Sequence, residues 1–130
     1  MYGFSVTFPG TYEQALTRVT EELQKEGFGI LTEIDVQAVM KKKLNLDKRP
    51  YKILGACNPV LANQALSVEP DIGLLLPCNV VVREEENGSI NVGFMDPQAV
   101  LTLVNRQDIT ALANEVRNKL LNVREALRKG

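Results

Sequence analysis

The chain has 130 residues, of which 45% are apolar and 24% charged, as in an ordinary globular protein. Fifteen basic and 16 acidic residues give a net charge of −1, so no whole-molecule field attracts nucleic acid or anionic lipid. The absence of histidine excludes Ser-His-Asp and Cys-His catalytic systems, and two cysteines cannot build a zinc site alone. We therefore expect no metal, no cofactor and no nucleic-acid partner.

The expected location is the cytoplasm. The first residues, Met1–Ser5, have neither a basic segment nor a long apolar run, so no secretory signal is predicted. The longest apolar runs, at 74–76 and 80–82, are far too short to span a bilayer, and no membrane association is expected. Two cysteines are also too few for a secreted disulfide scaffold.

Alternation and capping signals predict a strand and then a helix at the start of the chain. Apolar residues alternate over 2–8, which is typical of one face of a strand: Phe4, Val6 and Phe8. Thr11 and Gln14 fit a capping box, and Gly27 suits the end of the helix. The apolar positions between them recur at spacings of 3 and 4: Tyr12, Leu16, Val19 and Leu23.

Two more strand–helix units follow in the first half. Residues 28–34 predict a second strand with Phe28, Ile30 and Ile34 on one side, and Asp35 is expected to cap a short helix. After a polar loop, residues 51–57 predict a third strand. Asn58 and Pro59 then form an N-cap and first-turn pair for a third helix.

The second half predicts a long strand and a hairpin. The strand covers Gly73 to Glu85, with Pro77 indicating an edge position or a bulge midway. Residues 86–88 form the turn. A three-residue loop with Gly88 left-handed pairs Val82 with Val92 and Val80 with Phe94, which keeps apolar side chains on one face.

Two helices end the chain. Asp96 and Pro97 begin a short one, and Asp108 begins the longest. The longest helix carries an apolar stripe: Ile109, Leu112, Val116, Leu120, Val123 and Leu127. The order of elements predicts one α+β domain, residues 1–130, with a mixed, largely antiparallel sheet of about five strands and helices packed on it. The stripe is expected to dock on the sheet, with a dimer contact as the alternative.

Two similar blocks carry the most distinctive chemistry, Cys57-Asn58-Pro59 and Pro77-Cys78-Asn79. Cys57 precedes a helix start, where free N–H groups and the helix dipole can lower a thiol pKa or hold an anion. Cys78 lies on the next strand, where it could form a disulfide with Cys57 or share a soft metal ion. The alternative is that both cysteines are small buried apolar residues.

Charge is concentrated in one segment. Six positive residues fall within twelve positions against Asp47 alone: Lys41, Lys42, Lys43, Lys48, Arg49 and Lys52. They suit an anionic ligand or simply a solvated helix end. Glu33 and Asp35 share a strand face and could act as a carboxylate pair, although capping already explains Asp35.

Several blocks together resemble the domain-of-unknown-function family 302: residues 27–35, 51–59, 75–80 and 95–97. The resemblance spans almost the whole chain. It implies a compact α+β domain of about this size, commonly a dimer, found mainly in bacteria and archaea. It implies no established reaction, substrate or cofactor, and no catalytic residue can be assigned.

The leading hypothesis is a homodimeric domain that binds a small ligand, with an anion as one class, and has no established catalysis. The candidate ligand-binding residues are Lys52, Cys57, Asn58, Pro59, Pro77, Cys78 and Asn79. One alternative is a thiol-based redox or soft-metal protein that uses Cys57 and Cys78. Another is a structural partner in an assembly that binds no ligand.

Overall fold

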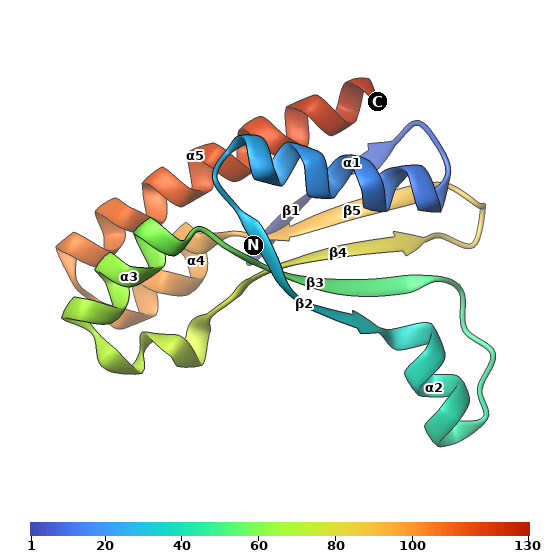
Figure 1. Cartoon of the computed structure of the whole chain (residues 1–130), viewed down its shortest axis with the longest axis horizontal. Coiled ribbons are helices and arrows are strands. Elements are labelled where there is room, and N and C mark those ends of the chain that lie inside the picture. The colour runs from blue at the N-terminus through green and yellow to red at the C-terminus, as the bar shows by residue number, and fades with distance from the viewer.

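The computed structural model describes residues Met1–Gly130 as alternating strands and helices (Figure 1). The strands are β1 (Gly3–Phe8), β2 (Gly29–Asp35), β3 (Tyr51–Cys57), β4 (Cys78–Glu84) and β5 (Ile90–Met95). The α-helices are α1 (Tyr12–Lys25), α2 (Val36–Leu44), α3 (Pro59–Val68), α4 (Pro97–Leu101) and α5 (Gln107–Lys129). Two short 3₁₀ segments, η1 (Pro70–Leu75) and η2 (Thr102–Val104), complete the chain.

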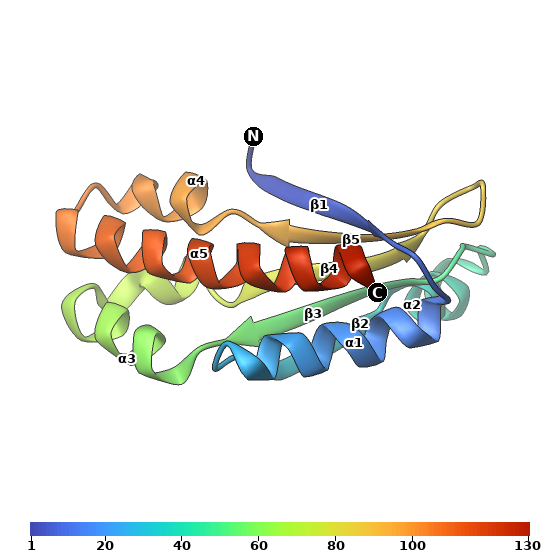
Figure 2. The same cartoon turned by 90° about the horizontal axis from the view of Figure 1, so that it is seen from above.

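The five strands form one sheet in the order β1-β5-β4-β3-β2, and every neighbouring pair is antiparallel. Helices α1 and α5 lie side by side on one face of it, as Figures 1 and 2 show together. Helices α3 and α4 lie beyond one end of the sheet, and α2 projects at the opposite end (Figure 1). The predicted fold class is confirmed.

The core lies between the sheet and the two helices above it. The sheet contributes alternate residues that are fully buried, such as Val80, Val82 and Val92. The predicted stripe of α5 supplies Leu120 and other side chains from the opposite side, so this helix packs on its own sheet. At about 25 cal/mol per Å² of apolar surface, such burial is the main stabilising contribution to the fold.

The predicted hairpin register is confirmed. Val82 lies opposite Val92 and Val80 opposite Phe94. Gly88 has a φ of 86°, the left-handed conformation that the three-residue loop requires, and its N–H donates to the Glu85 carbonyl at 2.9 Å.

The prediction of one strand over Gly73 to Glu85 is wrong in its first part. Residues up to Leu75 form η1, and the strand begins only at Cys78, after a cis Leu76–Pro77 peptide bond. The strand is central in the sheet, so Pro77 marks neither an edge nor a bulge within it. Because Pro77 precedes the first residue of β4, its missing N–H interrupts no ladder there.

The second strand also differs from its predicted pattern. Ile30 pairs with Ala56, and the register then shifts before Thr32, which leaves Leu31 in a bulge. The bulge rotates the rest of the strand, so Ile34 lies opposite Ile53 and is 47% exposed. Ile30 and Ile34 therefore do not share a side, since one extra residue exchanges the two faces of a strand.

Candidate functional site

Asn58 joins the end of α1 to the start of α3. Its Oδ1 accepts a hydrogen bond from the Leu61 N–H at 3.3 Å, which is the predicted N-cap. Its Nδ2 donates to the Glu26 carbonyl at 3.4 Å. Gly27 has a φ of 85°, and a Cβ at that position would lie 3.0 Å from Asn58 Nδ2. The Cys-Asn-Pro block therefore anchors two helix termini to each other.

Gly55 allows two other blocks to meet on the sheet. A Cβ at this position would overlap Thr32 Oγ1 and would lie 2.8 Å from Pro77 Cγ. Only a residue without a side chain leaves room for both neighbours, one from β2 and one from the segment before β4. This close approach brings Pro77 and Cys78 to the end of β3 that carries Cys57.

An apolar pocket lies where these segments converge. It has a volume of about 300 Å³ and is bounded by the end of β3, the start of β4, and residues from α3, η1, α4 and α5. Four candidate residues line it: Cys57, Asn58, Pro77 and Cys78. Of its 16 lining residues 13 are hydrophobic, including Leu66 and Leu112, so the pocket suits an uncharged, apolar group.

Both thiols are free, and burial makes them poor sources of thiolate. Cys78 is 6% exposed, and burial, with a smaller contribution from the neighbouring Cys57, raises its pKa to about 12. Cys57 is half-buried, and burial raises its pKa as well. This direction is opposite to the one that a helix start alone would produce.

Lys52 lies at the other end of β3, away from the pocket. Its Nζ donates to Glu33 Oε1 at 2.5 Å, so its charge is already paired. Asp35 caps α2 by accepting from the Ala38 N–H at 2.9 Å. Burial, followed by the charges of Asp35 and Glu33, raises the pKa of the nearby Tyr12 to about 12.

The remaining two candidates face solvent elsewhere. Pro59 is exposed in the first turn of α3. Asn79 is exposed on the face of the sheet that α1 and α5 leave open, where it lines a shallower hollow of about 500 Å³ with Tyr51 and Arg83. The seven candidates are thus divided among the pocket, the exposed first turn of α3, the open face and the start of β3.

The last sequence block, Met95-Asp96-Pro97, has a structural role away from the pocket. Asp96 caps α4 by accepting from the Gln98 N–H at 3.0 Å. Its two carboxylate oxygens also accept from Arg117 Nε at 3.1 and 3.2 Å, which ties α4 to α5. This contact holds α4 beside α5. Leu101 of α4 and Leu112 of α5 both line the pocket.

Sequence reasoning did not identify most of the pocket. Leu61, Ala65 and Leu112 belong to helical apolar stripes, which predict burial but give no sign of a cavity. Their common position results from how α3 and α5 pack beyond the sheet. No three Asp, Glu or Cys side chains lie close enough together to hold a metal ion. None of the helices has the length and apolar composition needed to cross a membrane.

Comparison with known proteins identifies a matching family and similar solved structures. The family model described as Domain of unknown function DUF302 matches residues 4–127. The crystal structure of an uncharacterized conserved DUF302 protein from Bacillus stearothermophilus superposes with a TM-score of 0.91 at 29% sequence identity. The alignment covers 98% of this chain and 99% of that one. No curated protein matches the sequence.

Proposed function

The chain belongs to the DUF302 family, whose description names no activity, and we propose that it is a homodimeric binding domain for a small apolar ligand. The observation that carries the proposal is the pocket between β3, β4 and α3, in which 13 of 16 lining residues are hydrophobic. Its volume of about 300 Å³ is at the lower end of the range for small-molecule sites.

The lining chemistry favours an aliphatic or small aromatic group over an anion. No lysine or arginine lines the pocket, and Lys52, which suggested an anionic ligand, is paired with Glu33 at the far end of β3. Transfer of apolar surface from water is worth about 25 cal/mol per Å². An apolar ligand that fills the pocket therefore gains more binding free energy than a ligand whose charge must leave water to enter it.

A series of linear alcohols from butanol to decanol tests the proposal. We expect saturable binding that strengthens with chain length until the pocket is full, with amide NMR shifts centred on residues 56–66. The variant Ala62→Leu, which places a larger side chain at the pocket wall, is expected to weaken binding at least about tenfold. The matched control Ala111→Leu adds the same atoms at an exposed position of α5 and should bind as the parent does.

The binding proposal fails if the alcohols do not saturate. It also fails if Ala62→Leu and Ala111→Leu bind them equally well while both variants remain folded. Shifts concentrated around Tyr51 and Arg83 would instead assign binding to the hollow on the open face.

Thiol chemistry is a second candidate because Cys57 and Cys78 line the same pocket. The raised pKa of both thiols limits the thiolate needed for redox reactions or for soft-metal binding. The third candidate, a structural role in an assembly, agrees with the exposed apolar side chains at both ends of the open face. A cytoplasmic location and the organisation as one domain over residues 1–130 remain predictions.

A further inference from the structure

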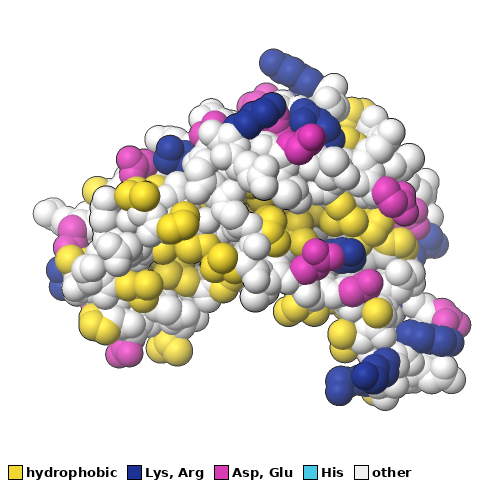
Figure 3. Space-filling model, in the orientation of Figure 1, with side chains coloured by type: hydrophobic (Ala, Val, Ile, Leu, Met, Phe, Trp, Pro, Cys, Tyr) yellow, Lys and Arg dark blue, Asp and Glu magenta, His cyan; other side chains and the backbone are white.

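Two exposed projections flank the open face of the sheet. At one end, α2 and the loop after it form what we call the basic arm, residues 36–49. At the other end, α3 and η1 form the acidic lobe, residues 59–75. Figure 1 shows the arm and the lobe at opposite ends of the same side of the sheet, and Figure 3 shows the surface between them as a concave arch.

The basic arm carries both apolar and cationic side chains, and few of them pack against the rest of the chain. No residue of α2 is buried, and Val39, Leu44 and Leu46 are exposed, Leu44 to 62%. The arm contains five cationic residues and a single acidic one, Asp47. Asp47 pairs with Lys41 at 3.0 Å and Arg49 lies 3.7 Å from Glu84, whereas three lysines have no ion-pair partner: Lys42, Lys43 and Lys48.

The acidic lobe has the matching character. It contains no lysine or arginine, and its two carboxylates, Glu69 and Asp71, form no ion pair. Four large apolar side chains are exposed on it, Leu74 to 86%: Val60, Leu66, Val68 and Leu74. Such grouped apolar exposure is typical of an interaction surface.

We infer that the partner of these surfaces is a second copy of this chain, with the arm of each copy seated on the lobe of the other. Neither surface suits itself, because two arms repel and two lobes repel. A two-fold axis through the arch pairs each arm with the opposite lobe, so one operation satisfies both surfaces of both copies. Carboxylates and lysines then surround paired apolar side chains, which is the usual anatomy of a specific interface.

This interface rests on the homodimer of the proposed function and adds a role for it at the pocket. Leu31 and Leu66 both line the pocket and are exposed to solvent, Leu66 on the acidic lobe itself. An arm seated on the lobe covers Leu66, so the second copy closes part of the pocket wall. Dimerisation therefore excludes water from the ligand and strengthens its binding.

Charge reversal with complementation tests the interface by sedimentation equilibrium. The arm variant Lys42→Glu, Lys43→Glu and the lobe variant Glu69→Lys, Asp71→Lys should each dissociate at least about tenfold more readily than the parent. An equimolar mixture of the two should regain a heterodimer, since both of its arm–lobe contacts are again between opposite charges. The control Arg128→Glu, Lys129→Glu reverses two charges at the exposed end of α5 and should dimerise as the parent does.

The outcomes separate the interface from the dimer and from ligand binding. A parent chain that is only monomeric at micromolar concentration overturns both the interface and the homodimer. A dimer that survives both reversals, or a mixture that stays monomeric, overturns the interface alone. Alcohol binding in the dissociated variants reports the pocket independently, and we expect it to persist with lower affinity.

Discussion

Gly55 has no side chain, and this allows a close contact with Pro77, which lines the pocket. Its neighbours are Thr32 of β2 and Pro77, which directly precedes β4. Together they occupy the space that a Cβ would need. Pro77 in turn precedes Cys78, which lies in the pocket wall. The contact at Gly55 thus connects the sheet to the segment that borders the pocket.

We predict that Gly55→Ala destabilises the fold by about 1–3 kcal/mol, because the added methyl group displaces Thr32 or Pro77. Gly29→Ala is the matched control. No atom lies within 4 Å of a Cβ built there, and its φ is not positive. The control should therefore be neutral or gain up to about 1 kcal/mol from the lower entropy of the unfolded chain. Denaturant unfolding measures both, and equal effects would refute the packing argument.

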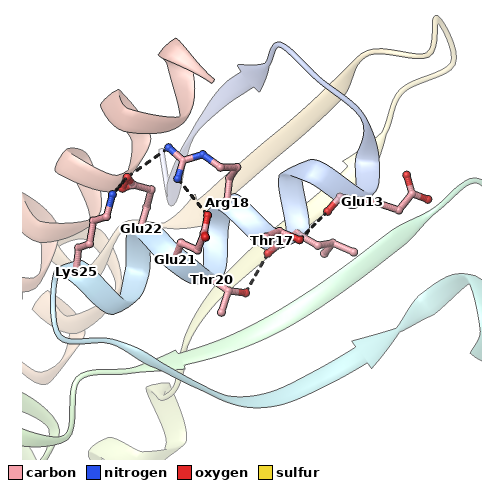
Figure 4. A network of polar contacts seen from close by, with 8 residues as sticks. Glu13, Thr17, Arg18, Thr20, Glu21, Glu22 and Lys25 are labelled. Carbon is pink, nitrogen blue, oxygen red and sulfur yellow. Dashed lines mark hydrogen bonds and ion pairs between the residues drawn. The ribbon is translucent and has the colours of Figure 1, made fainter.

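At the scale of an element, α1 holds a buried carboxylate, Glu22, and supplies the two cationic side chains that pair with it. Glu22 is buried among apolar neighbours such as Val19 and Leu23. Its Oε1 accepts from Lys25 Nζ at 2.8 Å and from Arg18 at 3.4 Å, contacts drawn in Figure 4. The hydrogen bond and charge of Lys25, with help from Arg18, lower the pKa of Glu22 despite the opposing effect of burial.

We predict that Glu22→Gln lowers the free energy of unfolding by about 1–2 kcal/mol at neutral pH. Because the folded-state pKa of Glu22 is lowered, its contribution is present above the ordinary value of 4.5 and is lost as pH falls through the folded-state pKa. The difference between parent and variant should therefore shrink below pH 4.5. Glu21→Gln is the control, since Glu21 also contacts Arg18 but its side chain is 54% exposed. Glu21→Gln should have a smaller effect, because solvent screens the charge of an exposed side chain. If the difference between the parent and Glu22→Gln does not change with pH, the lowered pKa of Glu22 is contradicted.

At the scale of the whole molecule, two weak acids, the Cys78 thiol and the Tyr12 hydroxyl, are expected to make the fold less stable at high pH. Burial raises the pKa of Cys78 from 9.0 to about 12, and burial with nearby carboxylates raises that of Tyr12 from 10.0 to about 12. The two groups lie at different ends of the structure, one beside the pocket and the other close to the start of α2. Both stay protonated in the folded chain after the unfolded chain has lost those protons.

We predict that stability falls as pH rises from about 9 towards 12, because the unfolded state releases protons that the folded state retains. Cys78→Ala removes one of these groups. Its free energy of unfolding should decline less steeply than that of the parent, by about 1.4 kcal/mol per pH unit. Below pH 8 the two curves should run parallel, with a constant offset from the lost side-chain contacts. Curves that stay parallel up to pH 12 would show that Cys78 titrates normally.

The sequence by itself determined those features that depend on neighbours along the chain. The capping box at Thr11 and Gln14, the N-cap at Asn58 and the bulged hairpin at Gly88 are all present as predicted. The stripe on α5 is buried because its period matches the helix. Local hydrogen bonds and side-chain periodicity depend on residues only a few positions apart, so they can be predicted from the sequence alone.

Only the tertiary structure decided what depends on distant segments. The bulge at Leu31 exchanged the faces of β2, and pairing with both β3 and β5 placed β4 at the centre of the sheet. Lys52 and Cys57 belong to one strand, yet its length separates the charge from the thiol. The pocket exists because α3, η1 and α5 pack beyond the sheet without filling the space between them, and packing over that distance leaves no periodic signal in the sequence.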